Sequence, residues 1–414
     1  MALIPFSPPR VDDETIAEVT AALKSGWITT GPRTKQFEKE LSAYNGNEYT
    51  LCLNSATAGL EIMLRWFGVK EGDEVILPAY TYAATANVVV HCGARPVLVD
   101  VNAEDFNINV ANVKAAITSR TKVIMPVDFG GLPCDYKELM ELVNAPDVKS
   151  KFVAATDIQK QLGRIMVLSD AAHSLGATYY GKRTGVWADA SVFSFHAVKN
   201  LTTAEGGAIA LMLPRPFSNE EVYKFLCIYT LHGQNKDALA KMQKGNWKYD
   251  IIEAGFKCNM TDLVAAIGLV ELRRYNDDTL IVRKQVCDYY YDALSVFDWA
   301  QLPILRDEHR ESSYHLFPLR IKGVSEEQRD AIIQAIFDED VSVNVHFIPL
   351  PQLSFYKKQG FNIDDYPVTY SNFANEISLP IFYDLTTEQK QRVVAAVVKA
   401  VHKVIQNSEL GIQN

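Results

Sequence analysis

Short apolar runs alternate with helix-type patterns across the first half of the chain, and this alternation most constrains the fold. Between the runs, apolar residues recur every three or four positions, as on one face of a helix. The runs occupy residues 49–53, 74–77, 96–101, 123–127, 165–168, 190–195 and 208–211. Strands interleaved with helices predict an α/β fold whose mostly parallel sheet is covered by helices on both faces.

The pattern changes beyond about residue 260. Long helix patterns come first, and strand and helix patterns then follow in mixed order. The helices are expected at 263–275, 282–294, 326–337 and 387–404, and the strands at 314–321 and 341–346. We therefore expect a large α/β domain with an N-terminal arm over residues 1–275 and a smaller C-terminal α+β domain over residues 276–414.

Charge and cysteine usage argue against several classes of protein. The net charge is −9 and the basic residues form no stripe, so nucleic acid is not an expected partner. The six cysteines are scattered without a C-x-x-C pair, which argues against a zinc site and is typical of reduced cytoplasmic thiols. No apolar run approaches the roughly 18 residues of a membrane span, and no signal-peptide pattern is visible. We expect a cytoplasmic protein without membrane contact.

Lys199 lies just beyond the strand expected at 190–195, in the segment SFHAVKN (194–200). Enzymes built on parallel sheets place reactive groups at strand ends. An amine in a partly desolvated site loses its proton more readily, and it can then attack a carbonyl carbon. A solvated surface position is the more common explanation for a single lysine, so Lys199 alone does not define a site.

An acid and a histidine follow the apolar run at 165–168, in the segment SDAAH (169–173). A carboxylate at a strand end, such as Asp170, can pair with the cationic ring nitrogen of a bound cofactor. It can equally cap a helix. His173 can contact such a ring or be an ordinary hydrogen-bonded core residue.

Small and hydroxylated residues separate the first strand from the next helix, in the segment NSATAG (54–59). The backbone amides of Ala56 and Thr57 would lie at a helix N-terminus, where amides and the helix dipole bind anions. The hydroxyl of Ser194 can reach the same anion. Tyr82, which follows the strand at 74–77, can stack on a flat ring, although core packing is more common for such an aromatic residue.

In this order and spacing the segments resemble the DegT/DnrJ/EryC1/StrS family of sugar aminotransferases, which have the pyridoxal-phosphate (PLP) fold-type I. The resemblance covers nearly the whole chain. Besides the segments above, it includes GWITTGP (26–32), GFKCNMTD (255–262) and SLP (378–380). The lysine segment, together with Lys257 and Asn259, is most similar to the UDP-4-amino-4-deoxy-L-arabinose aminotransferase type.

The resemblance implies a catalytic set and a cofactor, pyridoxal 5′-phosphate. Lys199 would bind the cofactor covalently and move a proton between the cofactor and the sugar. Asp170 would pair with the pyridine nitrogen, and His173 would lie near the ring oxygen. No metal is implied.

The resemblance also assigns the other contacts of the cofactor. Tyr82 would stack on its ring, while Ala56, Thr57 and Ser194 would hold its phosphate. Asn259 would reach the phosphate of the neighbouring subunit, so the resemblance implies a homodimer with shared active sites.

The implied reaction moves an amino group from an amino acid, glutamate, to a nucleotide-linked keto sugar at C4. Two alternatives remain. One is a PLP-dependent sugar dehydratase of the same fold, but such relatives have histidine in place of Lys199. The other is a non-catalytic regulator, which the intact set of site residues argues against. Asp128 and Ser169 stand where relatives often have histidine and glutamate, and these differences leave the identity of the sugar open.

Overall fold

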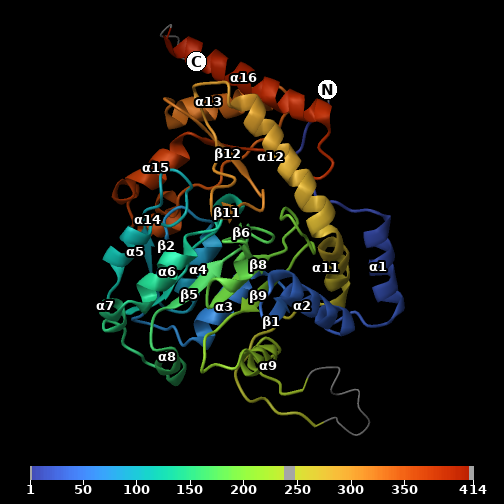
Figure 1. The fold of residues 1–414 in the computed structure, drawn as a ribbon, viewed down its shortest axis with the longest axis vertical. Coiled ribbons are helices and arrows are strands. Elements are labelled where there is room, and N and C mark those ends of the chain that lie inside the picture. Colours follow the sequence, from blue (N-terminus) through green and yellow to red (C-terminus); the bar gives the residue numbers. More distant parts are fainter. Residues whose placement is uncertain (1, 237–247, 410–414) are drawn as a thin grey trace.

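A computed structural model describes residues 2–236 and 248–409 (Figure 1). Seven strands form a central sheet: β1 (Tyr49–Leu53), β2 (Glu74–Pro78), β3 (Arg95–Val99), β4 (Thr121–Ile124), β5 (Met166–Asp170), β8 (Ala190–Ser194) and β9 (Gly207–Leu211). Their order is β1-β9-β8-β5-β4-β2-β3. The neighbours from β8 to β3 are parallel, and only β9 runs antiparallel to both of its neighbours. The predicted fold class is confirmed.

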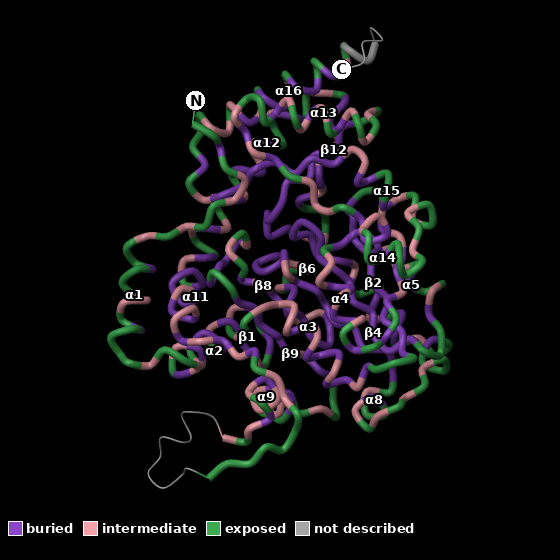
Figure 2. The backbone as a smooth tube through the Cα atoms, turned by 180° about the vertical axis from the view of Figure 1, so that it is seen from behind, coloured by how far each residue is buried: buried purple, intermediate pink, exposed green. Residues whose placement is uncertain are grey.

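Both faces of this sheet are covered by helices, so most residues of its strands are buried (Figure 2). Alternate residues along a strand point to opposite faces. On β5, Met166 and Leu168 therefore join one apolar cluster and Val167 joins another. The helices on the first face are α3 (Ala56–Trp66), α4 (Ala83–His91), α8 (Asp157–Leu162) and α9 (Asn219–Tyr229). Those on the second face are α2 (Pro32–Asn45), α5 (Val110–Ala116), α6 (Tyr136–Asn144), α7 (Pro146–Lys149) and α11 (Asp262–Arg274).

Three strands meet at one edge of the sheet, close to where α3 begins. Gly207, the first residue of β9, pairs with Leu53 at the end of β1 and with Ser194 at the end of β8. Because Gly207 has no Cβ, this strand can approach the first turn of α3. A Cβ at this position would lie 2.4 Å from the backbone nitrogen of Ala56. The ends of β1 and β8 and the start of α3 are therefore held together.

A second apolar core lies around a smaller sheet at the top of Figure 1. The sheet contains β10 (Ala300–Gln301), β12 (Phe317–Ile321) and β13 (Glu376–Leu379). The helices packed on it are α12 (Leu280–Leu294), α13 (Glu326–Phe337) and α16 (Thr387–Glu409). Ile4, near the start of the chain, is buried in this core, so the N-terminal arm crosses to it. A π-helical turn, Tyr275–Thr279, links α11 to α12.

The remaining elements are short or peripheral. They are α1 (Asp13–Lys24), α14 (Ser354–Lys358), α15 (Pro367–Ala374), and a small sheet of β6 (Thr178–Tyr179), β7 (Lys182–Arg183) and β11 (Arg310–Glu311). In residues 2–236 and 248–409, no helix combines the length and apolar character needed to cross a membrane.

The prediction of a strand at residues 341–346 is wrong. This segment makes only isolated bridges, from Val341 to Ile4 and from Asn344 to Ser378. The backbone N–H of His346 donates to the side chain of Glu376 instead of to a neighbouring strand. The alternating valines that suggested a strand are buried by packing, not by a ladder of backbone hydrogen bonds.

Candidate active site

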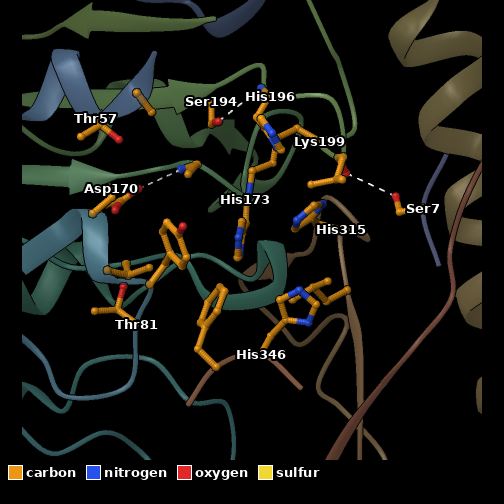
Figure 3. A pocket seen from close by; sticks show the side chains of 18 of the residues that line it. Ser7, Thr57, Thr81, Asp170, His173, Ser194, His196, Lys199, His315 and His346 are labelled. Atoms are coloured by element: carbon orange, nitrogen blue, oxygen red, sulfur yellow. Dashed lines mark hydrogen bonds between the residues drawn. The ribbon is translucent and has the colours of Figure 1, made fainter. Parts of the chain in front are cut away.

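Seven of the eight site residues predicted from the sequence line a single pocket of about 370 Å³. They are Ala56, Thr57, Tyr82, Asp170, His173, Ser194 and Lys199. The pocket opens at the sheet edge where β5 and β8 end, as expected for a ligand site in an open α/β sheet. Figure 3 shows the side chains of Asp170, His173 and Lys199 pointing into it. Asn259 is the exception and does not line the pocket of its own chain.

Lys199 lies in the loop between β8 and β9, whose two ends belong to one antiparallel pair. Its backbone N–H donates to the carbonyl of His196, which forms a tight turn beneath the side chain. Burial lowers the pKa of the Lys199 ammonium to about 8, and the Asp170 carboxylate opposes this shift. An amine with this pKa is neutral in a sizeable fraction of molecules near pH 8, which is the state needed for nucleophilic attack.

Asp170 is the last residue of β5 and is almost fully buried. The hydroxyl of Thr85, on α4, donates to Oδ2 at 2.8 Å, and the backbone N–H of Ala172 donates to Oδ1 at 3.3 Å. Burial raises the pKa of the Asp170 carboxyl, while these two bonds and the Lys199 charge lower it. A buried carboxylate held mainly by neutral donors is poised to take a cationic partner.

His173 lies between this carboxyl group and two further aromatic rings. The backbone N–H of Gly130 donates to Nδ1 of His173 at 3.3 Å, so the ring proton is on Nε2. The rings of His315 and Phe347 lie 4.3 and 5.9 Å away between centroids. Burial lowers the pKa of His173 well below its usual value, with the charge of Lys199 as a further cause. His173 is therefore a neutral hydrogen-bond donor near neutral pH.

Asp128 anchors the turn that carries His173. Its carboxylate accepts hydrogen bonds from the Tyr136 hydroxyl at 2.7 Å and the Ser174 hydroxyl at 2.6 Å. The Tyr136 hydroxyl also lies 2.5 Å from that of Ser169. Burial raises the pKa of Asp128 to about 6. Asp128 and Ser169 are thus joined through Tyr136 in one buried network.

The N-terminus of α3 supplies an anion site. The Ser55 side chain caps the helix by accepting from the Ala58 amide at 3.1 Å. Among the described residues, the amides of Ala56 and Thr57 have no hydrogen-bond acceptor. Helix N-terminal amides in this state bind phosphate groups. The side chain of Ser194 lines the same pocket.

Tyr82 is the residue before α4, and it is 64% exposed at the mouth of the pocket. Its ring lies 5.8 Å from that of Phe347. The two aromatic side chains form an apolar wall beside His173. A flat ligand in the pocket can be covered by this wall.

Asn259 lies at the end of β1, where it forms an isolated bridge with Leu53. Its side chain donates to the Thr30 hydroxyl and accepts from Lys257. Thr30 belongs to the segment at 26–32 that the family resemblance singled out. The segments at 26–32 and 255–262 are thus brought together by this bond, outside the pocket lining.

The structure adds residues that the sequence did not identify as site residues: Phe6, Thr85, His315 and Phe347 line the pocket or bond to Asp170. Phe6 comes from the N-terminal arm, and its ring stacks on that of His346 at 5.5 Å. His315 precedes β12 and could have been noticed as a polar residue before an apolar run. The contributions of Phe6 and Thr85 left no such signal.

A family model matches residues 9–398, which is most of the chain. The chain belongs to the DegT/DnrJ/EryC1/StrS aminotransferase family. The spore coat polysaccharide biosynthesis protein SpsC of Bacillus subtilis is 34% identical over 401 residues, which are 95% of this chain and 96% of SpsC.

Solved structures of aminotransferases match the fold closely. The putative sugar aminotransferase Spr1654 from Streptococcus pneumoniae, in its PMP-form, is 45% identical with a TM-score of 0.93, over 97% of this chain and 100% of Spr1654. Its PLP-form matches with a TM-score of 0.92 and 43% identity, over 97% of this chain and 99% of Spr1654. PseC from Helicobacter pylori, an aminotransferase involved in pseudoaminic acid biosynthesis, is 27% identical with a TM-score of 0.84, over 97% and 100% of the two chains.

Pyridoxal phosphate is the cofactor of this family, and the pocket fits it on three counts. The free amides at the start of α3 suit its phosphate. The buried carboxyl group of Asp170 suits its cationic ring nitrogen. The Lys199 amine, with its lowered pKa, suits its carbonyl carbon. All three groups line one pocket.

Proposed function

We propose that this protein transfers the amino group of glutamate to C4 of a nucleotide-linked keto sugar. The observation that carries the proposal is that Lys199, Asp170 and the start of α3 face the same pocket. The names of SpsC and PseC, which link those proteins to polysaccharide and pseudoaminic acid biosynthesis, support a sugar as the amino acceptor.

When bound, pyridoxal phosphate supplies an electron sink for breaking and forming bonds at the carbon that carries nitrogen. Lys199 binds the cofactor covalently and, once released from it, moves a proton at that carbon. Asp170 keeps the ring nitrogen protonated by charge pairing. His173 donates from Nε2 to the ring oxygen. In this proposal Tyr82 covers one ring face.

Ala56, Thr57 and Ser194 hold the phosphate by backbone amides and a hydroxyl, which fixes the ring against Lys199. Asn259 serves the pocket of a second copy in a homodimer. Ile16, Leu23 and Ile28 have exposed apolar side chains, and a second copy that covered them would remove apolar surface from water.

The proposal also includes two domains and a cytoplasmic location. The large α/β domain with the N-terminal arm comprises residues 1–275, and the small domain around the second core comprises residues 276–414. Scattered free cysteines, most of them buried, support a cytoplasmic location. A PLP-dependent dehydratase would lack the amine of Lys199, and its presence favours amino transfer over that alternative.

The test separates the two halves of the reaction. Purified protein is loaded with pyridoxal phosphate, and glutamate should remove the absorbance of the lysine-bound cofactor. Nucleotide-linked 4-keto and 3-keto sugars are then added singly, and the 4-keto sugar should restore the absorbance and yield an amino sugar identified by mass and NMR. Lys199→Ala should bind the cofactor without this absorbance and lose turnover. Wild-type turnover in that variant would refute the proposal, and so would a wild-type protein that accepts no keto sugar.

A further inference from the structure

A carboxyl group that does not line the pocket is connected to it through one of the pocket histidines. Nδ1 of His346 lies 2.9 Å from Oγ of Ser378, and this hydroxyl donates to Oε1 of Glu376 at 2.5 Å. The backbone N–H of His346 donates to Oε2 of the same carboxyl group at 3.0 Å. Ser378 and Glu376 lie on β13 and are fully buried, whereas His346 lines the pocket (Figure 3).

Glu376 has no ion-pair partner among the described residues, although two guanidinium groups lie near it. Arg329 bonds the carbonyl of Glu376 and pairs with Asp330, and Arg320 bonds other carbonyls and an amide. The phenol of Tyr80 also faces the carboxyl group. Burial raises the pKa of Glu376 to about 8, and its hydrogen bonds and the two guanidinium groups oppose this shift. Such a carboxyl group can gain or lose a proton near neutral pH.

The hydrogen bonds that link Glu376, Ser378 and His346 can run in either of two directions. When Glu376 is ionised, the Ser378 hydroxyl donates to it and must accept from Nδ1 of His346, so Nε2 carries no proton. When Glu376 is protonated, its O–H donates to Ser378, which donates to Nδ1, and Nε2 then carries the proton. The two states differ by one proton, and the ring is neutral in both.

A neutral ring is what this part of the pocket requires. Burial lowers the pKa of His346 to about 3, and the charge of Lys199 contributes. His173 and His315 also face His346, and burial lowers the pKa of both well below the usual value. A charged imidazolium is therefore disfavoured here, whereas a change of tautomer adds no charge next to Lys199.

We propose that Glu376 stores one proton for the pocket and exchanges it through Ser378 and the ring of His346. In the step toward the pocket, Nε2 of His346 gives its proton to an oxygen of the ligand. Nδ1 takes the proton of the Ser378 hydroxyl, and that oxygen takes the proton of Glu376. One proton leaves, the carboxyl group becomes a carboxylate, and no atom is oxidised or reduced.

The use of this proton rests on the proposed function. Amino transfer to a keto sugar expels the keto oxygen as water, and that oxygen must be protonated as its bond to carbon breaks. Lys199 is engaged in moving a proton at carbon, so a second proton source near it has a distinct role. We assign the keto oxygen of the sugar as the recipient.

The relay itself can be tested without turnover. In Glu376→Gln the side-chain oxygen must accept from the backbone N–H of His346, so the NH₂ group must donate to Ser378. The Ser378 hydroxyl then has to donate to Nδ1 of His346 at every pH. Nitrogen-15 NMR distinguishes the two histidine tautomers, and the His346 signals are assigned by their loss in His346→Gln among the eight histidines. At about pH 9.5, above the pKa of an ionisable carboxyl group, the proton of the His346 ring should be on Nδ1 in the wild type and on Nε2 in Glu376→Gln. The same tautomer in both proteins overturns the proposal.

The role in the reaction is tested with Ser378 variants. Ser378→Ala interrupts the relay and Ser378→Thr keeps a hydroxyl, so the pair is a matched control for packing. Ser378→Ala should slow the sugar half-reaction by about 10- to 100-fold, within the range of lost acid catalysis. It should leave the glutamate half-reaction within about twofold, and Ser378→Thr should restore the sugar half-reaction. Equal slowing of both halves, or of neither, overturns the proposal. A wild-type protein that accepts no keto sugar refutes the proposed function instead and leaves the tautomer result standing.

Discussion

Replacing Thr85 by valine should weaken cofactor binding although this residue does not line the pocket. The Thr85 hydroxyl donates to Oδ2 of Asp170 at 2.8 Å, and it is one of two hydrogen-bond donors to that carboxylate. Valine has nearly the same shape as threonine but cannot donate. The carboxylate would remain buried with one donor fewer, so its ionised form would become less stable.

The expected size of the effect follows from the charge of the acceptor. A hydrogen bond to an ionised group contributes about 1.5–3 kcal/mol, which raises the pKa of Asp170 by about 1–2 units when the bond is lost. Binding of a cationic ring nitrogen requires the ionised carboxylate. The dissociation constant of pyridoxal phosphate should therefore rise by about 10- to 150-fold at pH values low enough to protonate Asp170 in both free proteins, and progressively less at higher pH, where Asp170 stays ionised.

The assay is a titration of the protein with pyridoxal phosphate at several pH values, followed by absorbance. Thr85→Ser keeps the donor and should bind within about threefold of the wild type. Thr81→Val is a second control, because the Thr81 hydroxyl lies 2.9 Å from that of Thr85 and can donate to it, but does not bond to Asp170. Its effect should be less than about tenfold. A Thr85→Val protein that binds the cofactor as tightly as the wild type would refute this reasoning.

Three further predictions concern the support of the pocket. Gly207→Ala places a Cβ 2.4 Å from the nitrogen of Ala56, so it should displace the start of α3 and weaken cofactor binding at least about tenfold in the same titration. Arg164 pairs with the buried carboxylate of Asp189 through two bonds of 2.7 Å, and Arg164→Met should lower the free energy of unfolding in urea by about 3–5 kcal/mol; an unchanged midpoint would contradict it. The pKa of Lys199 near 8 means that its amine is neutral above that pH, so the rate of covalent cofactor attachment should rise up to about pH 8 and then level off; a rise continuing beyond pH 10 would contradict a lowered pKa.

The sheet and its strand ends could be predicted because buried parallel strands are continuous apolar runs with polar residues after them. Lys199 and Asp170 were found for this reason, and both line the pocket. The segment at 341–346 was misjudged because Val341 and Val343 are buried by side-chain packing, while the backbone N–H of His346 bonds to a side chain. Such a partner, far along the chain, leaves no periodic trace in the sequence.

Contacts that reach the site from distant parts of the chain could not be predicted from the sequence either. Phe6 enters the pocket because the N-terminal arm is tied to the second apolar core, where Ile4 forms an isolated bridge with Val341. The bond from Thr85 to Asp170 depends on how α4 packs against β5. Each is a consequence of tertiary packing between distant segments, which local patterns do not encode.

The position of β9 between β1 and β8 also bears on how the chain acquires its cofactor. A growing chain that ends before residue 207 lacks the strand that joins β1 to β8, so the phosphate-binding end of α3 and Ser194 have nothing to hold them together. Pairings between segments so distant in sequence form late and slowly, and a ligand that binds only the finished state stabilises it by mass action. The moment at which pyridoxal phosphate binds during refolding would therefore report when β9 joins the sheet.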